Sequence, residues 1–245
     1  MAKNRSRFRE IIKEYHTYLL FSLRQRGIWQ SLNLWFSEFC YTIKYGRFIA
    51  SRFEVFPAIL KENYEQKGYL PYQPTYYKVL LKSFSTLEID PERSTFIDIG
   101  CGKGKVLKFA GRYGFKKTIG IEIIKKLADK AEKKLIRNKR KYKTDYTLLN
   151  LDCLDYLPNE KIDVMFFYNP FKCSALNQFL KGMINSTYVP KYLIYVNPVC
   201  SDLVCSLGFE VVHTYKTGKY TEFSTFKFDD SKTTETFPFH FAYSG

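Results

Sequence analysis

Long hydrophobic runs and closely paired cysteines are missing from this 245-residue sequence. No stretch approaches the ~20 uncharged apolar residues that a membrane-spanning helix needs. The longest apolar run near the N-terminus, Tyr18–Phe21, is also too short for a secretory signal, so we expect a cytoplasmic protein. The six cysteines form no Cys-x-x-Cys pair, and no histidine follows them at zinc-finger spacing. We therefore expect reduced thiols and no metal site.

The composition is that of a folded globular protein. Hydrophobic residues make up 45% of the chain and charged residues 26%, which excludes a disordered, collagen-like or coiled-coil chain. The length fits one domain of ordinary size with an appendage. No Ser-His-Asp or Cys-His arrangement is legible in the sequence, so nothing indicates a nucleophilic catalytic triad.

Acidic residues are few relative to basic ones: 24 against 39, a formal net charge of +15. The stretch Arg112–Lys143 holds 13 basic and 3 acidic residues, and residues 1–70 hold 12 and 6. Such charge suits the phosphate backbone of a nucleic acid, an anionic glycan or an anionic membrane surface. Because lysine dominates over arginine, an ordinary solvated helix face is the favoured interpretation of the basic face at Arg112–Lys143. Charge alone leaves these alternatives open.

The first 70 residues are predicted to be helical. Apolar residues recur at helical spacing from Ser6 to about Lys67, and Gly27, Gly46 and Gly68 interrupt the pattern. The segment is rich in aromatic residues, so we expect a helical cap over residues 1–70 that packs on a second domain over residues 71–245. The alternative is an amphipathic arm that lies on a partner or contacts a membrane peripherally.

From Thr95 onward, short β-rich runs alternate with helical patterns, as is typical of βαβ units. The expected strands are Thr95–Ile99, Thr118–Ile123, Tyr146–Leu151, Asp163–Tyr168 and Tyr192–Val196. The expected helices are Lys78–Leu87, Lys103–Tyr113, Ile124–Lys141, Ser174–Asn185 and Ser201–Leu207. A hairpin pairs Phe209–Tyr215 with Tyr220–Phe228, and Thr236–Tyr243 suits a further edge strand. The sequence thus predicts an α/β fold: a Rossmann-like, mostly parallel open sheet with an antiparallel C-terminal hairpin.

The most informative segment is the run from Phe96 to Gly104, in which a buried strand enters a Gly-x-Gly-x-Gly turn that opens a helix. The third glycine of a dinucleotide site falls three residues after the second, whereas here Gly104 follows Gly102 by two. No Gly-Lys-Ser/Thr follows, which excludes a P-loop. Asp98 stands just before the turn, where a carboxylate repels pyrophosphate but suits an ammonium or sulfonium group.

Two further acids follow the next two strands. Glu122 ends the run Ile119–Glu122, where a carboxylate accepts two hydrogen bonds from a ribose diol. Asp152 follows the third strand, where it suits an adenine amino group; a helix N-cap is the alternative role, and Asp155 is a competing acid. Three acids on successive strand ends match an adenosine that bears a cationic amino-acid tail.

With these acids and the glycine turn, the sequence resembles the class I S-adenosylmethionine-dependent methyltransferases over roughly Tyr72–Phe228. The resemblance implies S-adenosylmethionine as the cofactor and methyl transfer as the activity. It also implies that Asp98 and the turn residues hold the methionine part, that Glu122 binds the ribose, and that Asp152 and Cys153 frame the adenine. The turn residues concerned are Gly100, Cys101, Gly102 and Gly104.

The fourth strand runs into Asn169-Pro170-Phe171, which is similar to the Asn/Asp-Pro-Pro-aromatic motif of amino-group methyltransferases. The resemblance implies that Tyr168, Asn169 and Phe171 line the methyl end of the site, with the amide oxygen of Asn169 accepting from the target nitrogen. This chain has one proline where that motif has two, so a nitrogen or an oxygen acceptor stays open.

Thr75 and Tyr76 precede the glycine turn in a segment that, in related methyltransferases, folds over the cofactor, so both are candidate contacts. The alternative function is a methyltransferase-like module that binds nucleic acid through the basic face without turnover.

Overall fold

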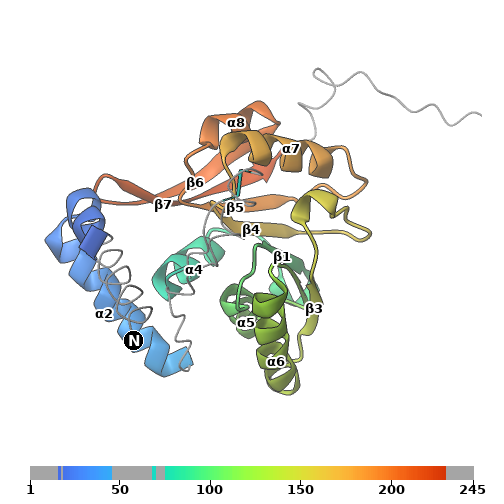
Figure 1. Cartoon of the computed structure of the whole chain (residues 1–245), viewed down its shortest axis with the longest axis horizontal. Helices are drawn as coiled ribbons and strands as arrows, with labels where there is room; N and C mark the ends of the chain where they lie inside the picture. The colour runs from blue at the N-terminus through green and yellow to red at the C-terminus, as the bar shows by residue number, and fades with distance from the viewer. Residues whose placement is uncertain (1–15, 18, 46–67, 70–74, 230–245) are drawn as a thin grey trace, which may run out of the picture.

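The fold is an open α/β sheet, seen in a computed structural model that describes residues 16–17, 19–45, 68–69 and 75–229 (Figure 1). Seven strands form one sheet in the order β3-β2-β1-β4-β5-β7-β6. β1 to β5 run parallel, and β7 runs antiparallel to both β5 and β6. The predicted mostly parallel Rossmann-like sheet with an antiparallel C-terminal hairpin is confirmed.

The strands form where β-branched and aromatic residues cluster between polar turns. Their bounds are β1 Thr95–Ile99, β2 Lys117–Ile121, β3 Asp145–Leu149, β4 Val164–Tyr168, β5 Tyr192–Val196, β6 Phe209–Thr217 and β7 Tyr220–Phe228. β1 and β5 have the predicted bounds, whereas β2 and β3 begin and end one or two residues earlier. The expected edge strand Thr236–Tyr243 lies outside the described residues.

Helices cover both faces of the sheet. Their bounds are α2 Ile28–Tyr45, α4 Tyr77–Phe84, α5 Lys105–Tyr113, α6 Lys125–Tyr142, α7 Cys173–Ile184 and α8 Ser201–Ser206. Because successive side chains of a strand point to opposite faces, β1 places Phe96 in a core with α4 and α5, and Ile97 in a second core with α7 and α8. Figure 1 shows α7 and α8 on one side of the sheet and α4 and α5 on the other.

The glycine turn delays the start of α5. The helix begins at Lys105 rather than at the predicted Lys103, because Gly102 and Gly104 both have positive φ, 56° and 73°, which a right-handed helix does not accommodate. Gly104 is the N-cap of α5. The turn is therefore two residues longer than the sequence pattern indicated, and it carries its backbone N–H groups outside the helix.

The N-terminal helices pack on the sheet domain. Residues 19–26 are helical, and Gly27, with a φ of 82°, separates them from α2 as predicted. Arg26 forms a buried ion pair with Glu222 of β7, and the hairpin tip touches the same helix, since the N–H of Lys219 donates to the carbonyl of Gln25 over 2.8 Å. Residues 46–67 lie outside the described part of the chain, so the domain boundary at residue 70 stays a prediction.

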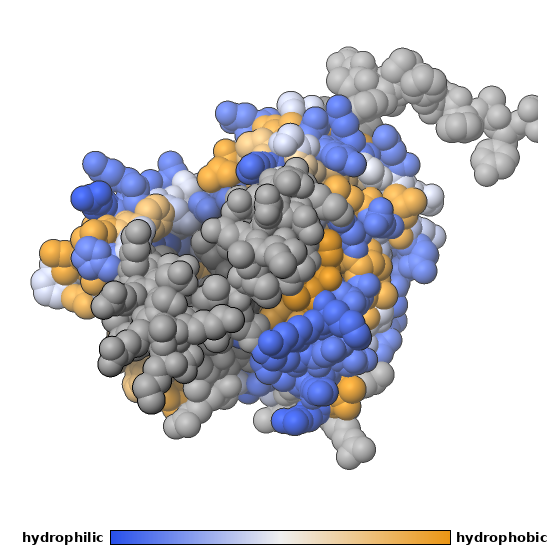
Figure 2. Space-filling view, viewed as in Figure 1, coloured by the Kyte–Doolittle hydropathy of each residue, from blue (hydrophilic) through white to orange (hydrophobic). Residues whose placement is uncertain are grey.

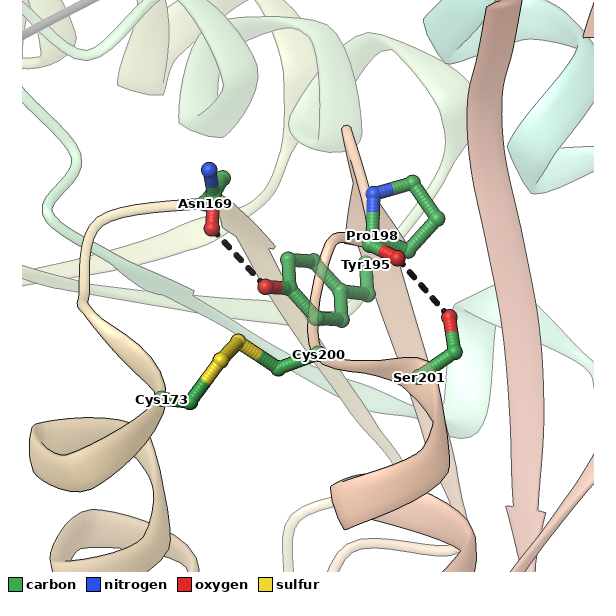
Figure 3. The surroundings of a disulfide bond; sticks show 6 residues. All are labelled: Asn169, Cys173, Tyr195, Pro198, Cys200 and Ser201. Atoms are coloured by element: carbon green, nitrogen blue, oxygen red, sulfur yellow. Dashed lines mark hydrogen bonds between the residues drawn. A yellow bond between two sulfur atoms is a disulfide. The ribbon is translucent and has the colours of Figure 1, made fainter.

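The expectation that all six thiols are reduced is wrong for two of them. Cys173, at the start of α7, and Cys200, at the N-cap of α8, form a disulfide across 27 residues of sequence (Figure 3). The sequence pattern did not reveal this pair because only the packing of α7 beside α8 brings the two cysteines together. Of the other cysteines, Cys101 is buried and Cys40 is exposed.

None of the helices within the described ranges has the length and apolar character that crossing a membrane requires. The same residues contain no group of three or more His, Cys, Asp or Glu side chains arranged to hold a metal ion.

Candidate active site

The glycine turn lies at the carboxyl end of β1, between β2 and β4. The N–H groups of Gly100 and Cys101 both donate to the carbonyl of Ile121, each over 2.9 Å, which anchors the turn to the end of β2. Gly100, like Gly102 and Gly104, has a positive φ, a conformation that glycine adopts without strain. Open α/β sheets bind ligands at this kind of position, where the strand order reverses.

Neighbouring segments approach the turn closely. A Cβ added to Gly104 would lie 3.1 Å from the Cβ of Ala131 in α6, so glycine permits the tight packing of the turn on that helix. A Cβ added to Gly100 would lie 3.8 Å from the Cβ of Pro170. The Asn169-Pro170 segment therefore borders the glycine turn.

Asp98 is the most unusual charged group of the site. Its side chain is 3% exposed, and among the described residues its Oδ2 atom has no hydrogen-bond partner. Burial raises the pKa of Asp98 well above its ordinary value, and the nearby charge of Glu122 raises it further. A buried carboxylate is costly unless a positive group or hydrogen-bond donors compensate it. The unsatisfied oxygen therefore fits a cationic ligand.

Glu122 directly follows β2 and braces the turn. Its Oε2 accepts a hydrogen bond from the N–H of Gly102 over 2.8 Å, and its Oε1 accepts one from the N–H of Ile124 over 2.9 Å. Burial raises the pKa of Glu122, while these backbone donors partly oppose the shift. The carboxylate is thus held in one orientation at the strand end where the sequence predicted a ribose-binding acid.

Asp152 has the capping role that the sequence left as an alternative. Its Oδ1 accepts from the N–H of Leu154 over 3.1 Å and so caps the short 3₁₀ helix η2, Cys153–Asp155. The same oxygen accepts from the hydroxyl of Tyr69, a contact that the sequence analysis missed because 83 residues separate the two. Burial, followed by the charge of Asp152, raises the pKa of Cys153 to about 12, so this thiol stays protonated. The adenine-binding role of the pair stays a prediction.

Asn169 follows β4 in a left-handed conformation with a φ of 35°, which asparagine tolerates better than most residues. Its Oδ1 accepts a hydrogen bond from the hydroxyl of Tyr195 in β5 over 2.8 Å (Figure 3). Tyr195 is fully buried, and the sequence analysis did not single it out, because it reads as one more apolar residue of a buried strand.

The other two residues of this motif differ in exposure. Tyr168 is half-buried at the end of β4. Phe171 is 2% exposed, and its ring packs on Phe179 at 5.4 Å and on Tyr69 at 5.6 Å between centroids. These contacts give Phe171 a structural role in the core.

The segment before α4 is tied to both α2 and α5. Lys105, the first residue of α5, places its Nζ 2.5 Å from Oε1 of Glu38 and 2.6 Å from the carbonyl oxygen of Thr75. Oε2 of Glu38 accepts from the N–H of Tyr77 over 2.7 Å. Thr75 and Tyr76 are both buried. The helical cap therefore contacts the segment next to the glycine turn through Glu38, a link that the sequence alone did not reveal.

Part of the predicted basic face is engaged within the protein. Arg112 donates to the carbonyl of Tyr45 over 2.6 Å at the end of α2, and Lys117 pairs with Glu160 over 2.5 Å. Several exposed basic residues of this face lie on α6, and Figure 2 shows a hydrophilic surface over that helix. They include Lys125, Lys126, Lys133 and Arg137.

The outer side of α2 carries exposed apolar side chains at helical spacing. They are Ile28, Trp29, Leu32, Phe36, Phe39 and Ile43. Figure 2 shows hydrophobic atoms at the left edge of the molecule, where Figure 1 places the N-terminal helices.

Comparisons with known proteins show which family and which fold the chain is similar to. Residues 53–169, just under half of the chain, match the model of the family described as histone methylation protein DOT1. No curated protein sequence matches the chain.

Three solved structures illustrate the likeness. Ribosomal protein L11 methylase from Lactobacillus delbrueckii subsp. bulgaricus is 14% identical, with a TM-score of 0.51 over 62% of this chain and 78% of that one. The small RNA methyltransferase HEN1 is 16% identical, with a TM-score of 0.52 over 64% of this chain and 26% of that one. Magnesium protoporphyrin IX methyltransferase from Synechocystis PCC 6803 is 16% identical, with a TM-score of 0.48 over 61% of this chain and 74% of that one.

The first two structures, whose TM-scores exceed 0.5, show that this chain has the fold of those methyltransferases. Together with the family match over residues 53–169 and the glycine turn between strand-end acids, they support the interpretation of the chain as a class I S-adenosylmethionine-dependent methyltransferase, for which S-adenosylmethionine is the cofactor.

Proposed function

We propose that the protein transfers a methyl group from S-adenosylmethionine to a nitrogen or oxygen atom of its acceptor by in-line displacement. The observation that carries this proposal is the buried Asp98, whose Oδ2 lacks a partner among the described residues at the end of β1. The ammonium group of the cofactor's methionine part would satisfy that oxygen, and the N–H groups of the glycine turn would hold the neighbouring carboxylate.

The remaining cofactor contacts follow from the strand ends. Glu122 would bind the ribose diol, Asp152 and Cys153 would border the adenine, and Thr75 and Tyr76 would cover the methionine end. When bound, the cofactor supplies a methyl group on a positively charged sulfur, which is already a good leaving group. The protein's contribution is then mainly the alignment of acceptor and methyl group, for which Asn169 and Tyr168 lie at the bordering strand end.

Calorimetric titration with S-adenosylhomocysteine tests the proposal. The wild-type protein should bind this ligand, and Glu122→Gln should bind it about tenfold or more weakly, because a charge-assisted hydrogen bond contributes about 1.5–3 kcal/mol. Glu92→Gln is the matched control: Glu92 is an exposed acid at the opposite end of β1, and its substitution should leave the affinity unchanged. Absence of wild-type binding at high micromolar ligand would contradict the proposal.

The second candidate function is a module that binds nucleic acid through the basic face without turnover. The exposed lysines of α6 favour it, whereas the engagement of Arg112 and Lys117 within the protein reduces the available charge. Such a module would bind labelled RNA with an affinity that falls steeply as salt increases. A Lys126→Gln, Lys133→Gln variant should then bind more weakly with a shallower salt dependence, and equal binding by both proteins would count against this function.

Two further proposals concern partners and location. The exposed apolar side of α2 supports the predicted contact with a membrane surface. The cytoplasmic location remains a proposal. Reduced thiols no longer support it, because Cys173 and Cys200 form a disulfide.

A further inference from the structure

We propose that the methyl acceptor presents an oxygen atom, with a lone pair for a hydrogen bond, to the amide N–H groups of Asn169, and that Tyr195 is the positioning residue that sets this preference. The inference deepens the proposed function and rests on it. It departs from the nitrogen-acceptor motif, in which the asparagine oxygen faces the target.

The first step is the direction of the hydrogen bond between Tyr195 and Asn169. Tyr195 is fully buried, and burial raises the pKa of its hydroxyl to about 12, so the group is neutral and keeps its proton. A protonated hydroxyl can donate, and that of Tyr195 donates to Oδ1 of Asn169 over 2.8 Å. The amide atom that faces Tyr195 is therefore Oδ1.

The second step is the position of the amide nitrogen. With Oδ1 fixed on Tyr195, the Nδ2 atom points away from that ring (Figure 3). Within the described ranges, Nδ2 has no hydrogen-bond partner, and Asn169 is only half-buried. The following residue, Pro170, borders Gly100 of the glycine turn. Two N–H donors are therefore available at the strand end beside that turn.

The third step is the chemistry of the attacking atom. An oxygen nucleophile directs one lone pair at the methyl carbon and keeps a second to accept from an N–H of Asn169. An attacking amine uses its only lone pair on the methyl group, and its remaining hydrogens would meet the hydrogens of the amide. The arrangement therefore discriminates in favour of oxygen.

A carboxylate is the oxygen acceptor that fits most directly. One of its oxygens forms a bond to the methyl carbon, the carbon–sulfur bond breaks, and its electron pair stays on sulfur. The products are a methyl ester and neutral S-adenosylhomocysteine. Because a carboxylate is already ionised at neutral pH, this reaction releases no proton and needs no base.

Cofactor analogues provide a test that does not require the acceptor to be known. S-adenosyl-S-carboxymethyl-L-homocysteine carries a carboxylate attached to the transferable carbon, whereas sinefungin carries an amine in place of the methylsulfonium. We expect the wild-type protein to bind the carboxymethyl compound about tenfold more tightly than S-adenosylmethionine, as a charge-assisted hydrogen bond would provide. Sinefungin should bind no more tightly than S-adenosylhomocysteine. Calorimetric titration measures all four affinities.

Two variants separate a positioning role from a structural one. Tyr195→Phe removes the hydroxyl that fixes the amide, so the advantage of the carboxymethyl compound should fall to threefold or less. Asn169→Asp keeps the shape of the side chain but replaces the N–H donors by an oxygen, so the preference should reverse towards sinefungin. Because both readouts are ratios between ligands on one protein, a general loss of stability does not produce them.

The outcomes are distinct. A wild-type protein that binds S-adenosylhomocysteine but prefers sinefungin, or that gains less than threefold from the carboxylate, overturns the inference and leaves the proposed function standing. Ratios that neither substitution changes also overturn it. Failure to bind S-adenosylhomocysteine at all overturns the proposed function, and the inference with it.

Discussion

Replacing Arg26 by Met should lower the free energy of unfolding by about 3–5 kcal/mol, the usual cost of leaving one partner of a buried ion pair uncompensated. Arg26 is 3% exposed and Glu222 is 2% exposed. The guanidinium donates to both carboxylate oxygens, over 2.5 Å and 3.0 Å, and lies 4.2 Å from the ring centroid of Tyr220. In the variant, the charge of Glu222 stays buried without its partner. Urea denaturation followed by circular dichroism measures the change.

Two controls test that explanation. The double variant Arg26→Met, Glu222→Leu removes both charges, so it should be more stable than the single variant, because apolar pairs often replace buried ion pairs at little cost. Arg93→Met breaks a pair with Asp90 whose side chains are 88% and 57% exposed, and it should cost less than about 1 kcal/mol. Equal stabilities of the single and double Arg26 variants would show that lost packing, not the unpaired charge, destabilises the protein.

Replacing Asp98 by Asn should have opposite effects on cofactor binding and on stability. Binding of S-adenosylhomocysteine should weaken about 10- to 100-fold, because the amide loses the charge that the ligand's ammonium group would neutralise. The ligand-free variant should be more stable than the wild type at neutral pH by about 1–3 kcal/mol, since the amide has no charge that burial would penalise. Calorimetry and thermal unfolding of the same preparations measure the two effects.

The pH dependence of the free energy of unfolding tests the predicted stabilisation by Asp98→Asn independently. The pKa of Asp98 is raised in the folded protein, so the folded state holds this proton more tightly than the unfolded state. Its contribution to stability is therefore full below the unfolded pKa of about 4 and is lost as the pH rises through the folded pKa. The stability gain of Asp98→Asn over the wild type should grow over that interval. A gain that stays constant from pH 4 to pH 8 would show that Asp98 does not titrate as proposed.

The pattern of residues along the chain was sufficient to predict most of the fold. The alternation of β-rich and helical segments predicted all seven strands of the sheet, and β1 and β5 have the predicted bounds. The glycine turn and Glu122 were also found from local order, because strand, turn and acid follow one another directly. Helix starts were less accurate, as at α5, where the left-handed conformation of Gly104 postpones the first turn.

The site was only partly predictable, because local order along the chain reveals its residues but not their distant partners. Asp98, Glu122, Asp152 and Asn169 were identified from their places at or just after strand ends, but their partners were not. The hydroxyl donor to Asn169 comes from Tyr195, 26 residues later, and the donor to Asp152 comes from Tyr69, 83 residues earlier. Neither tyrosine differs in sequence pattern from the many aromatic residues that only fill the core.

The sequence by itself therefore determined the succession of strands and helices along the chain, the glycine turn and the acids beside it, since each depends on residues that are neighbours in the chain. Only the tertiary structure decided which groups meet: Arg26 with Glu222, Cys173 with Cys200, and Tyr195 with Asn169. These contacts depend on strand register and helix packing, which bring together residues that are 26 to 196 positions apart. A one-dimensional pattern carries no signal for such distances, whereas the packing of the sheet fixes them.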